Sequence, residues 1–366
     1  LACALVAAAA IASLAGCAAP PAKPSADASS SLFYPGPPDP PRVQHLTKYS
    51  TERDVAQQGG FADFVAGKEG SEDRLMRPYG AALYKGKLYV GDTRAAGVAV
   101  FDLAQRKYYI IEGTGAGRLQ RPVNVAVDAD GTKYVTDLGR NQIVMFDANE
   151  RYVGAFGEKG QFRPADVLVA GDRLYVSDLQ QDEIQVLDKR TGKLLFKFGT
   201  EGDRKLGQPT NLALSPEGDI YVVETGNFRV SRYTRDGKLV NRFGEVGQVH
   251  GTFARPKGIA VDRDGRIYVG DSAFQNVQIF DANGKVLMAF GQPRDGSAGL
   301  NLPAGVSVDY DNVELFRRYA APGFELEYVI LVVSQFGPDQ VDVFGFGKMR
   351  GATYPADDAP APKPGK

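Results

Sequence analysis

The chain has 366 residues, of which 43% are hydrophobic and 24% are charged, and its 43 basic and 44 acidic side chains leave a net charge of −1. This balance is typical of a soluble globular protein, and it lacks the basic excess that nucleic-acid binding requires, so nucleic acid is excluded as the main partner. Both cysteines, Cys3 and Cys17, lie in the first 17 residues. Their position excludes a disulfide scaffold, a CxxC zinc site and a haem-attachment motif further along the chain.

The first segment predicts export. Residues 1–16 form an uncharged apolar run that resembles the core of a signal peptide. The run ends in the sequence LAGC, which closes with Cys17 and resembles a bacterial lipobox. That resemblance implies a diacylglycerol on the Cys17 thiol and a membrane anchor, so we expect an outer-membrane lipoprotein on the periplasmic or cell-surface side. An ordinary secretory signal with an incidental cysteine is the alternative.

Two biased segments flank the folded part. Residues 17–41 are rich in Pro, Ala and Ser, which predicts a semi-extended spacer behind the anchor. Residues 352–366 have a similar bias and are predicted to be a disordered tail. The folded domain is therefore expected to span residues 42–351.

Six prolines divide this domain into units of 42 to 47 residues, a period typical of propellers and solenoids. They are Pro78, Pro122, Pro164, Pro209, Pro256 and Pro303. Each proline opens a short strand with period-two alternation, and two further strands follow in every unit. Units two to five add a fourth strand that ends in Phe-Gly. The pattern predicts an all-β, six-bladed β-propeller with four antiparallel strands per blade.

The sixth unit lacks a fourth strand of its own after Phe346, while residues 42–49 precede the first unit without another assignment. We expect residues 42–49 to pair as the outer strand of blade six, because closing the ring removes an exposed sheet edge.

The proline, the Asp-Gly turn, the Tyr-Val strand and the Phe-Asp strand together resemble the NHL repeat over residues 77–347. In addition, residues 37–46 and 317–347 resemble a group of bacterial NHL lipoproteins whose genes tend to lie beside those of multihaem c-type cytochromes. This resemblance implies a scaffold that binds extracytoplasmic proteins, with multihaem c-type cytochromes among the expected partners.

The strands that line a propeller channel place Asn124, Asp166 and Asn211 at one repeat position of successive blades, with Glu224 as a fourth oxygen donor. Such donors suit Ca²⁺, and some six-bladed lactonases hold a divalent ion in this way. A calcium-dependent, lactonase-like hydrolase is therefore the alternative function. We favour polar side chains that satisfy buried waters and backbone groups, without a cofactor, because repeat geometry alone explains the spacing.

Four arginines, Arg77, Arg121, Arg163 and Arg255, directly precede blade prolines. Acidic residues recur on the same expected face, at Asp92, Asp137, Asp178, Glu224 and Asp271. The arginines predict either an anion-binding ring or ion pairs with these carboxylates between blades. Repetition around the ring favours the ion pairs, since a functional site usually breaks symmetry.

The chain contains neither a GxSxG elbow nor a Walker loop, so binding is expected rather than catalysis. The expected partner contacts are loop residues Arg94, Arg140, Phe228 and Phe274, because arginine and aromatic side chains are common interface anchors.

Overall fold

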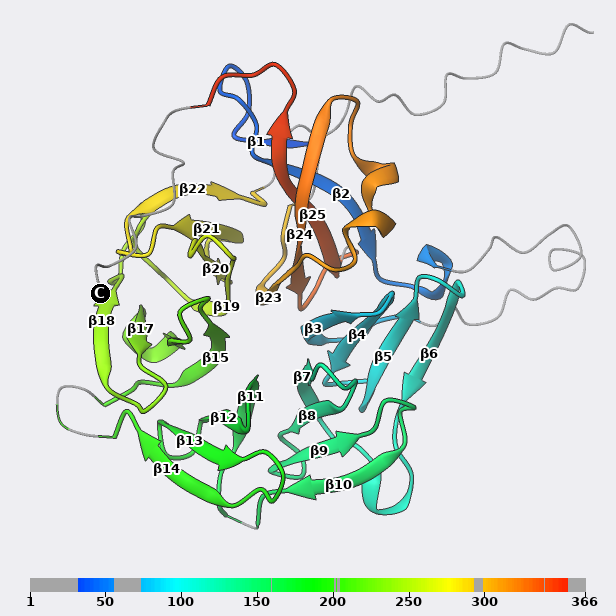
Figure 1. The fold of residues 1–366 in the computed structure, drawn as a ribbon, viewed down its shortest axis with the longest axis vertical. Coiled ribbons are helices and arrows are strands. Elements are labelled where there is room, and N and C mark those ends of the chain that lie inside the picture. Colours follow the sequence, from blue (N-terminus) through cyan, green and yellow to red (C-terminus); the bar gives the residue numbers. More distant parts are fainter. Residues whose placement is uncertain are drawn as a thin grey trace, which may run out of the picture.

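The structure, a computed structural model, describes residues 32–55, 74–158, 160–200, 202, 205–292, 299–338 and 340–354. They form six antiparallel sheets arranged in a ring (Figure 1), which confirms the predicted six-bladed β-propeller. The signal segment, the lipobox with Cys17, most of the 17–41 spacer and residues 355–366 of the tail lie outside the described residues.

Blades one to five each consist of four consecutive strands. Blade one contains β3 (Pro78–Tyr84), β4 (Lys87–Asp92), β5 (Gly97–Asp102) and β6 (Lys107–Ile111). Blade two contains β7 (Pro122–Val127), β8 (Lys133–Asp137), β9 (Gln142–Phe146) and β10 (Tyr152–Phe156). Blade three contains β11 (Pro164–Ala170), β12 (Arg173–Asp178), β13 (Glu183–Asp188) and β14 (Leu194–Phe198). Blade four contains β15 (Pro209–Leu214), β16 (Ile220–Glu224), β17 (Arg229–Tyr233) and β18 (Leu239–Phe243). Blade five contains β19 (Pro256–Val261), β20 (Ile267–Asp271), β21 (Asn276–Phe280) and β22 (Val286–Phe290).

Blade six is built from both flanks of the domain. Its sheet contains β23 (Pro303–Asp309), β24 (Phe324–Ser334), β25 (Val341–Met349), β2 (Val43–Tyr49) and β1 (Phe33–Tyr34). Strand β2 runs antiparallel to β25, from Val43 opposite Phe346 to Tyr49 opposite Val341. The predicted ring closure is therefore confirmed, and β1 adds a fifth strand from within the segment expected to be spacer. Short 3-10 helices occur at η2 (Glu52–Asp54), η3 (Gly115–Gly117), η5 (Thr225–Asn227), η6 (Val313–Leu315) and η7 (Arg317–Tyr319).

Steric constraints explain why a glycine follows the last phenylalanine of the outer strands. Gly244 follows β18 with φ at 88°, and a Cβ there would meet the ring of Phe253 at 2.3 Å. Phe253 lies just before the inner strand of blade five. Glycine therefore permits the left-handed turn out of one blade and leaves room for the first aromatic ring of the next.

The hydrophobic core lies between neighbouring blades. Tyr175 and Val186 of blade three pack with Leu212 and Val222 of blade four in one buried cluster. Some of the second-strand tyrosines also reach the next blade with their hydroxyls: Tyr89 donates to Oε1 of Glu150 at 3.0 Å, and Tyr175 donates to the carbonyl of Arg235 at 2.8 Å. Burial of the ring and satisfaction of its hydroxyl together explain why tyrosine recurs at this position.

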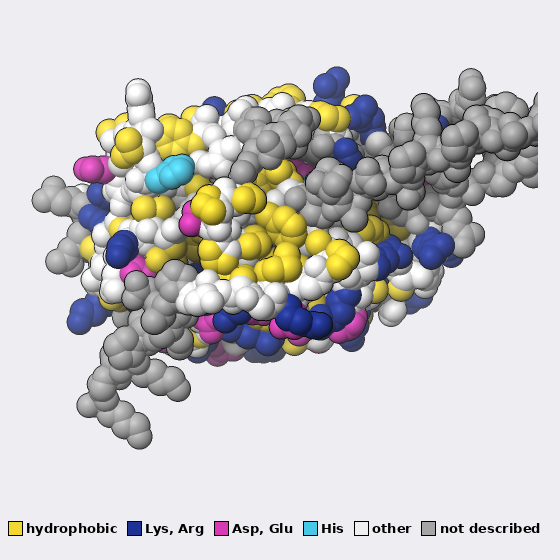
Figure 2. All heavy atoms as spheres, turned by 90° about the horizontal axis from the view of Figure 1, so that it is seen from above, with side chains coloured by type: hydrophobic (Ala, Val, Ile, Leu, Met, Phe, Trp, Pro, Cys, Tyr) yellow, Lys and Arg dark blue, Asp and Glu magenta, His cyan; other side chains and the backbone are white. Residues whose placement is uncertain are grey.

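Figure 2 looks onto the rim at blade six, where hydrophobic side chains cover a broad area among scattered charged ones. Here the two flanks meet, since the Tyr354 hydroxyl donates to the carbonyl of Pro41 at 2.8 Å. The first residues of the predicted tail therefore pack on the domain. Within the described ranges, no helix has the length and apolar character needed to span a membrane.

Candidate functional site

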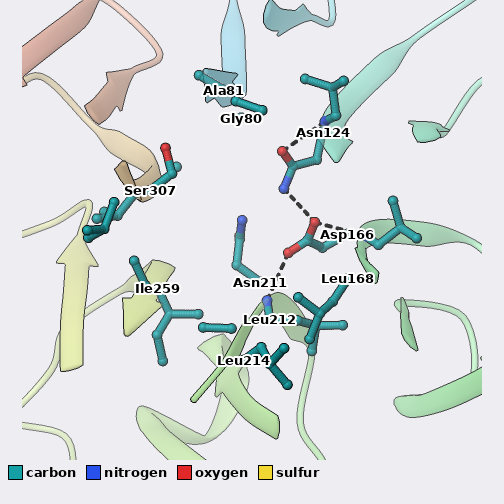
Figure 3. A pocket seen from close by; sticks show the side chains of 18 of the residues that line it. Gly80, Ala81, Asn124, Asp166, Leu168, Asn211, Leu212, Leu214, Ile259 and Ser307 are labelled. Atoms are coloured by element: carbon teal, nitrogen blue, oxygen red, sulfur yellow. Dashed lines mark hydrogen bonds between the residues drawn. The ribbon is translucent and has the colours of Figure 1, made fainter. Parts of the chain in front are cut away.

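The inner strands bring three of the predicted donors to one cavity. Asn124 from β7, Asp166 from β11 and Asn211 from β15 line the central channel, which encloses about 310 Å³. Figure 3 shows the three side chains pointing toward one another from adjacent blades. The period-two alternation of the strands explains this, because it fixes which residues face the axis.

These side chains are bonded to one another and to the backbone. The Nδ2 of Asn124 donates to Oδ1 of Asp166 at 2.6 Å, and the backbone N–H of Leu212 donates to Oδ2 at 2.8 Å (Figure 3). The backbone N–H of Val167 adds a third hydrogen bond to Oδ1 at 2.8 Å. Burial nevertheless raises the pKa of Asp166 to about 7, because removing the carboxylate from water outweighs these donors.

Glu224 does not join the channel cluster. Its buried carboxylate pairs with the Arg229 guanidinium at 2.9 Å. It also accepts hydrogen bonds from Asn227, from the Ser231 hydroxyl and from the backbone N–H of Gly207. The fourth predicted metal donor is therefore committed to holding the β16–β17 loop within blade four.

The channel residues do not fit a calcium ion. Ca²⁺ takes six to eight oxygen ligands at roughly 2.3–2.6 Å, including carboxylates. The cluster supplies a single carboxylate, and both of its oxygens already accept N–H bonds. The Oδ1 of Asn124 accepts from the backbone N–H of Val125, which leaves the Oδ1 of Asn211 as the one amide oxygen in the cluster without a partner. Across the described ranges, no group of three or more His, Cys, Asp or Glu side chains is arranged to hold a metal.

The other side of the channel places glycines at the same repeat position. They are Gly258, Gly305 and Gly80, of blades five, six and one. A Cβ on Gly305 would lie 2.5 Å from the backbone oxygen of Tyr79 and 3.1 Å from the Cα of Gly80. The inner strands of these blades therefore approach more closely than any side chain would permit.

Apart from Glu224, the recurring carboxylates bind backbone N–H groups rather than arginine side chains. Asp92 accepts hydrogen bonds from the backbone N–H groups of Met76 and Arg77 at 2.6 and 3.0 Å, and from those of Arg94 and Ala95 at 2.9 and 3.0 Å. Equivalent bonds to Asp137, Asp178 and Asp271 come from the backbone N–H groups of Arg121, Arg163 and Arg255. Each carboxylate thus ties together two loops of its own blade, and the predicted ion pairs between blades are wrong.

The four predicted partner contacts lie on loops of the same face but differ in exposure. Arg94 is exposed. The Arg140 guanidinium donates to the carbonyls of Ala116 and Arg118 and to the Gln142 side chain, so it is held within the protein. Phe228 packs on a hydrophobic cluster, and Phe274 is half-buried. Their role in binding remains a prediction.

Sequence reasoning missed an unusual group at the channel entrance. Lys257 follows a blade proline where the other blades carry Tyr79, Val123, Ala165, Thr210 and Ala304. It is 8% exposed. Nearby, Met76 and Phe336 are exposed hydrophobic residues at 47% and 44%. The signal was available in the sequence, because a lysine at this position breaks the repeat.

Comparison with known proteins agrees with this architecture. The NHL repeat model matches residues 253–280, so this six-bladed propeller carries an NHL repeat. The chain is 37% identical to the Drosophila melanogaster protein brain tumor over 140 residues, which is 36% of this chain but only 13% of that protein.

Two solved structures share the fold at low identity. A gluconolactonase from Xanthomonas campestris superimposes with a TM-score of 0.54 and 17% identity, over 84% of this chain and 98% of that one. The calcium-binding protein regucalcin from Agrobacterium tumefaciens superimposes with a TM-score of 0.53 and 12% identity, over 75% of this chain and 92% of that one. At such identities the likeness establishes the fold alone.

Proposed function

We propose that this protein is a lipid-anchored, extracytoplasmic propeller that binds other proteins, with multihaem c-type cytochromes as the partner class. A six-bladed scaffold with an NHL repeat supports a protein-binding role. The cytochrome class rests on the resemblance of residues 37–46 and 317–347 to bacterial NHL lipoproteins. These segments contribute to blade six, where they close the ring.

The observation that carries the proposal is an exposed patch, here called the entrance patch, which consists of Met76, Arg77 and Phe336. Met76 and Phe336 are 47% and 44% exposed, and the guanidinium carbon of Arg77 lies 5.3 Å from the centre of the Phe336 ring. Arginine and large apolar side chains are characteristic of interface hot spots. Arg94 is also exposed on the neighbouring β4–β5 loop, so it remains a candidate contact.

Capture of a defined partner tests this role. The wild-type protein, cross-linked in native membranes and purified, is expected to carry a haem protein with a c-type absorption spectrum. The double variant Met76→Ser/Phe336→Ser should weaken capture at least about tenfold, or 1.4 kcal/mol. Val246→Ser is a matched control, because Val246 is exposed at 67% on the β18–β19 loop. Equal capture by the double variant and the control would contradict the proposed surface.

Membrane anchoring has its own test at Cys17. If the LAGC sequence is a lipobox, Cys17→Ala should abolish lipid attachment and release the protein from the membrane fraction or block its processing. A Cys17→Ala protein that is cleaved normally and remains in the outer membrane would overturn this part of the proposal.

A calcium-dependent lactonase is the second candidate, favoured by the meeting of Asn124, Asp166 and Asn211 in one channel. The three N–H hydrogen bonds to the Asp166 carboxylate argue against a calcium ion there, because they already use both of its oxygens. Hydrolysis of simple lactones that requires Ca²⁺ and is lost in Asn124→Ala or Asn211→Ala would replace the scaffold role with an enzymatic one.

A further inference from the structure

Lys257 is a buried cation without a carboxylate partner. It is 8% exposed, its Nζ donates to Oε1 of Gln335 at 3.0 Å, and it lies 5.6 Å from the centre of the Tyr79 ring. Among the described residues, no carboxylate oxygen lies within 4.0 Å of its Nζ. Burial, reinforced by the positive charges of Arg255 and Arg77, lowers the pKa of Lys257 to about 8.

Two arginines add to this positive charge. Arg77 and Arg255 are exposed and sit directly before the inner strands of blades one and five. Their backbone N–H groups bind Asp92 and Asp271, but none of the ion pairs in the described part of the chain includes their guanidinium groups. Both positive charges therefore act on Lys257, and the Arg77 guanidinium also lies over the Phe336 ring, 5.3 Å from its centre.

An opposing charge, that of Asp166, lies in the channel. Burial raises the pKa of Tyr79, the Asp166 charge adds to this rise and the Arg255 charge opposes it, so both charges reach the Tyr79 side chain. Three N–H donors already bind the Asp166 carboxylate. No side chain in the described ranges bonds to the Tyr79 hydroxyl. The entrance between blades five, six and one thus contains the Lys257 ammonium and the guanidinium groups of Arg77 and Arg255. The Tyr79 hydroxyl adds a group without a side-chain partner among the described residues.

We propose that this entrance is a binding site for a small oxyanion, whose carboxylate or phosphate group accepts hydrogen bonds from Lys257 while Arg77 and Arg255 close over it. The ligand must be small or present a slender acidic group, because only 8% of Lys257 is exposed. The site goes beyond the proposed scaffold role, since it needs no protein partner.

The energetics of the buried lysine support this assignment. A buried ammonium that is bonded only to an amide oxygen carries a desolvation cost that a methionine of similar length would avoid. A bound oxyanion would offset that cost, because charge-assisted hydrogen bonds are roughly twice as strong as neutral ones. Lysine at this position is therefore disadvantageous for packing and advantageous for binding an anion.

Calorimetric titration of the purified protein tests the site, at constant ionic strength with chloride as the balancing ion. The probes are inorganic phosphate, citrate and a blocked triglutamate peptide. Wild-type protein should bind at least one of them saturably, and Lys257→Met should weaken that affinity at least about tenfold. Arg77→Gln should weaken that affinity about threefold or more. Because the Arg77 side chain is exposed, this variant should fold normally, so a loss of binding cannot be attributed to misfolding. Lys238→Gln is the charge-matched control, at an exposed turn of blade four, and should leave affinity unchanged.

The probes distinguish the source of the group. Binding of citrate or phosphate but not the peptide identifies a free small anion, while binding of the peptide identifies an acidic side chain of another protein. In the absence of ligand, Lys257→Met should melt at the same temperature as the wild type or higher. Absence of saturable binding by any probe, or equal affinity of wild type and Lys257→Met, overturns the proposal.

Discussion

The two sides of the channel occupy the same repeat position with opposite chemistry. In blades two to four the position holds Asn124, Asp166 and Asn211, and hydrogen bonds from Asn124 and Leu212 join the three blades through Asp166. In blades five, six and one it holds glycine, and at Gly258 and Gly305 backbone packs directly on the backbone of the next blade, while Gly80 leaves room for the Asn124 side chain. One side is therefore held together by polar bonds and the other by close packing.

This difference locates the unusual chemistry of the molecule. The polar side is internally satisfied apart from Asn211. The glycine side lies near an entrance where Lys257 has only an amide partner and where Arg77 and Phe336 are exposed. A repeat fold supplies the same frame six times, and a site appears where one unit departs from the repeat. The following experiments test the two sides, from the largest expected effect to the smallest.

The pH dependence of stability tests the polar side most strongly. Burial raises the folded-state pKa of Asp166 from 3.8 to about 7, so the folded protein retains a proton that the unfolded chain releases. The stability contributed by the protonated group is fully present below its unfolded pKa and is lost as pH rises through the folded value, by roughly 4 kcal/mol at most.

Asp166→Asn has no charge to bury at this position. We expect urea denaturation to show a steeper loss of stability between about pH 4 and pH 7 in the wild type than in Asp166→Asn. Parallel declines in the two proteins would show that the carboxylate keeps an ordinary pKa.

Gly305→Ala tests the glycine side. The added Cβ would lie 2.5 Å from the backbone oxygen of Tyr79, which cannot move without shifting a strand, so we expect a loss of about 1–3 kcal/mol in thermal denaturation. Gly154→Ala is the control, because its Cβ would meet only the flexible end of Met145 at 3.0 Å. Similar stability of both variants would show that the inner strands are not packed so closely.

Replacing Asn124 or Asn211 by alanine compares an amide side chain that is hydrogen-bonded to Asp166 with one whose oxygen has no partner. Asn124→Ala deletes a donor to Asp166 and should cost about 1–2 kcal/mol of unfolding free energy. Asn211→Ala should cost less, because the Oδ1 of Asn211 has no hydrogen-bond partner to lose. The opposite ranking in denaturant titrations would mean that Asn211 makes the more important contact.

Calcium should produce the smallest effect. Since both oxygens of Asp166 accept N–H bonds, about 5 mM CaCl₂ is expected to shift the melting temperature by less than about 1 °C. Magnesium chloride at the same concentration controls for ionic strength. A calcium-specific rise that Asp166→Asn abolishes would favour the lactonase-like function.

Much of the fold could be predicted because its signals are local. The prolines, the Tyr-Val strands and the Phe-Gly ends recur at one period, and Gly244 and Phe253 show the steric reason for the last of these. The closure of blade six by β2 was also predictable, since a ring with an unpaired edge is unfavourable.

The site was less predictable because its bonds depend on partners. Glu224 had the chemistry of a metal donor, but Arg229 and Ser231, a few residues later, bind its carboxylate instead. The arginines before the prolines suggested ion pairs, whereas only their backbone N–H groups meet the carboxylates. In both cases the residue types were correct and the atoms that meet were not deducible from spacing.

The sequence by itself determined the number of blades, the closure of the ring and which side chains face the channel, because strand alternation and the repeat period depend only on neighbouring residues. Only the tertiary structure decided how those side chains are used. Asp166 is bonded to blades two and four, and Lys257 lies near Tyr79 and Gln335, which are 178 and 78 positions away. Burial and charge balance at the channel depend on such distant contacts, which exist only once the ring has closed.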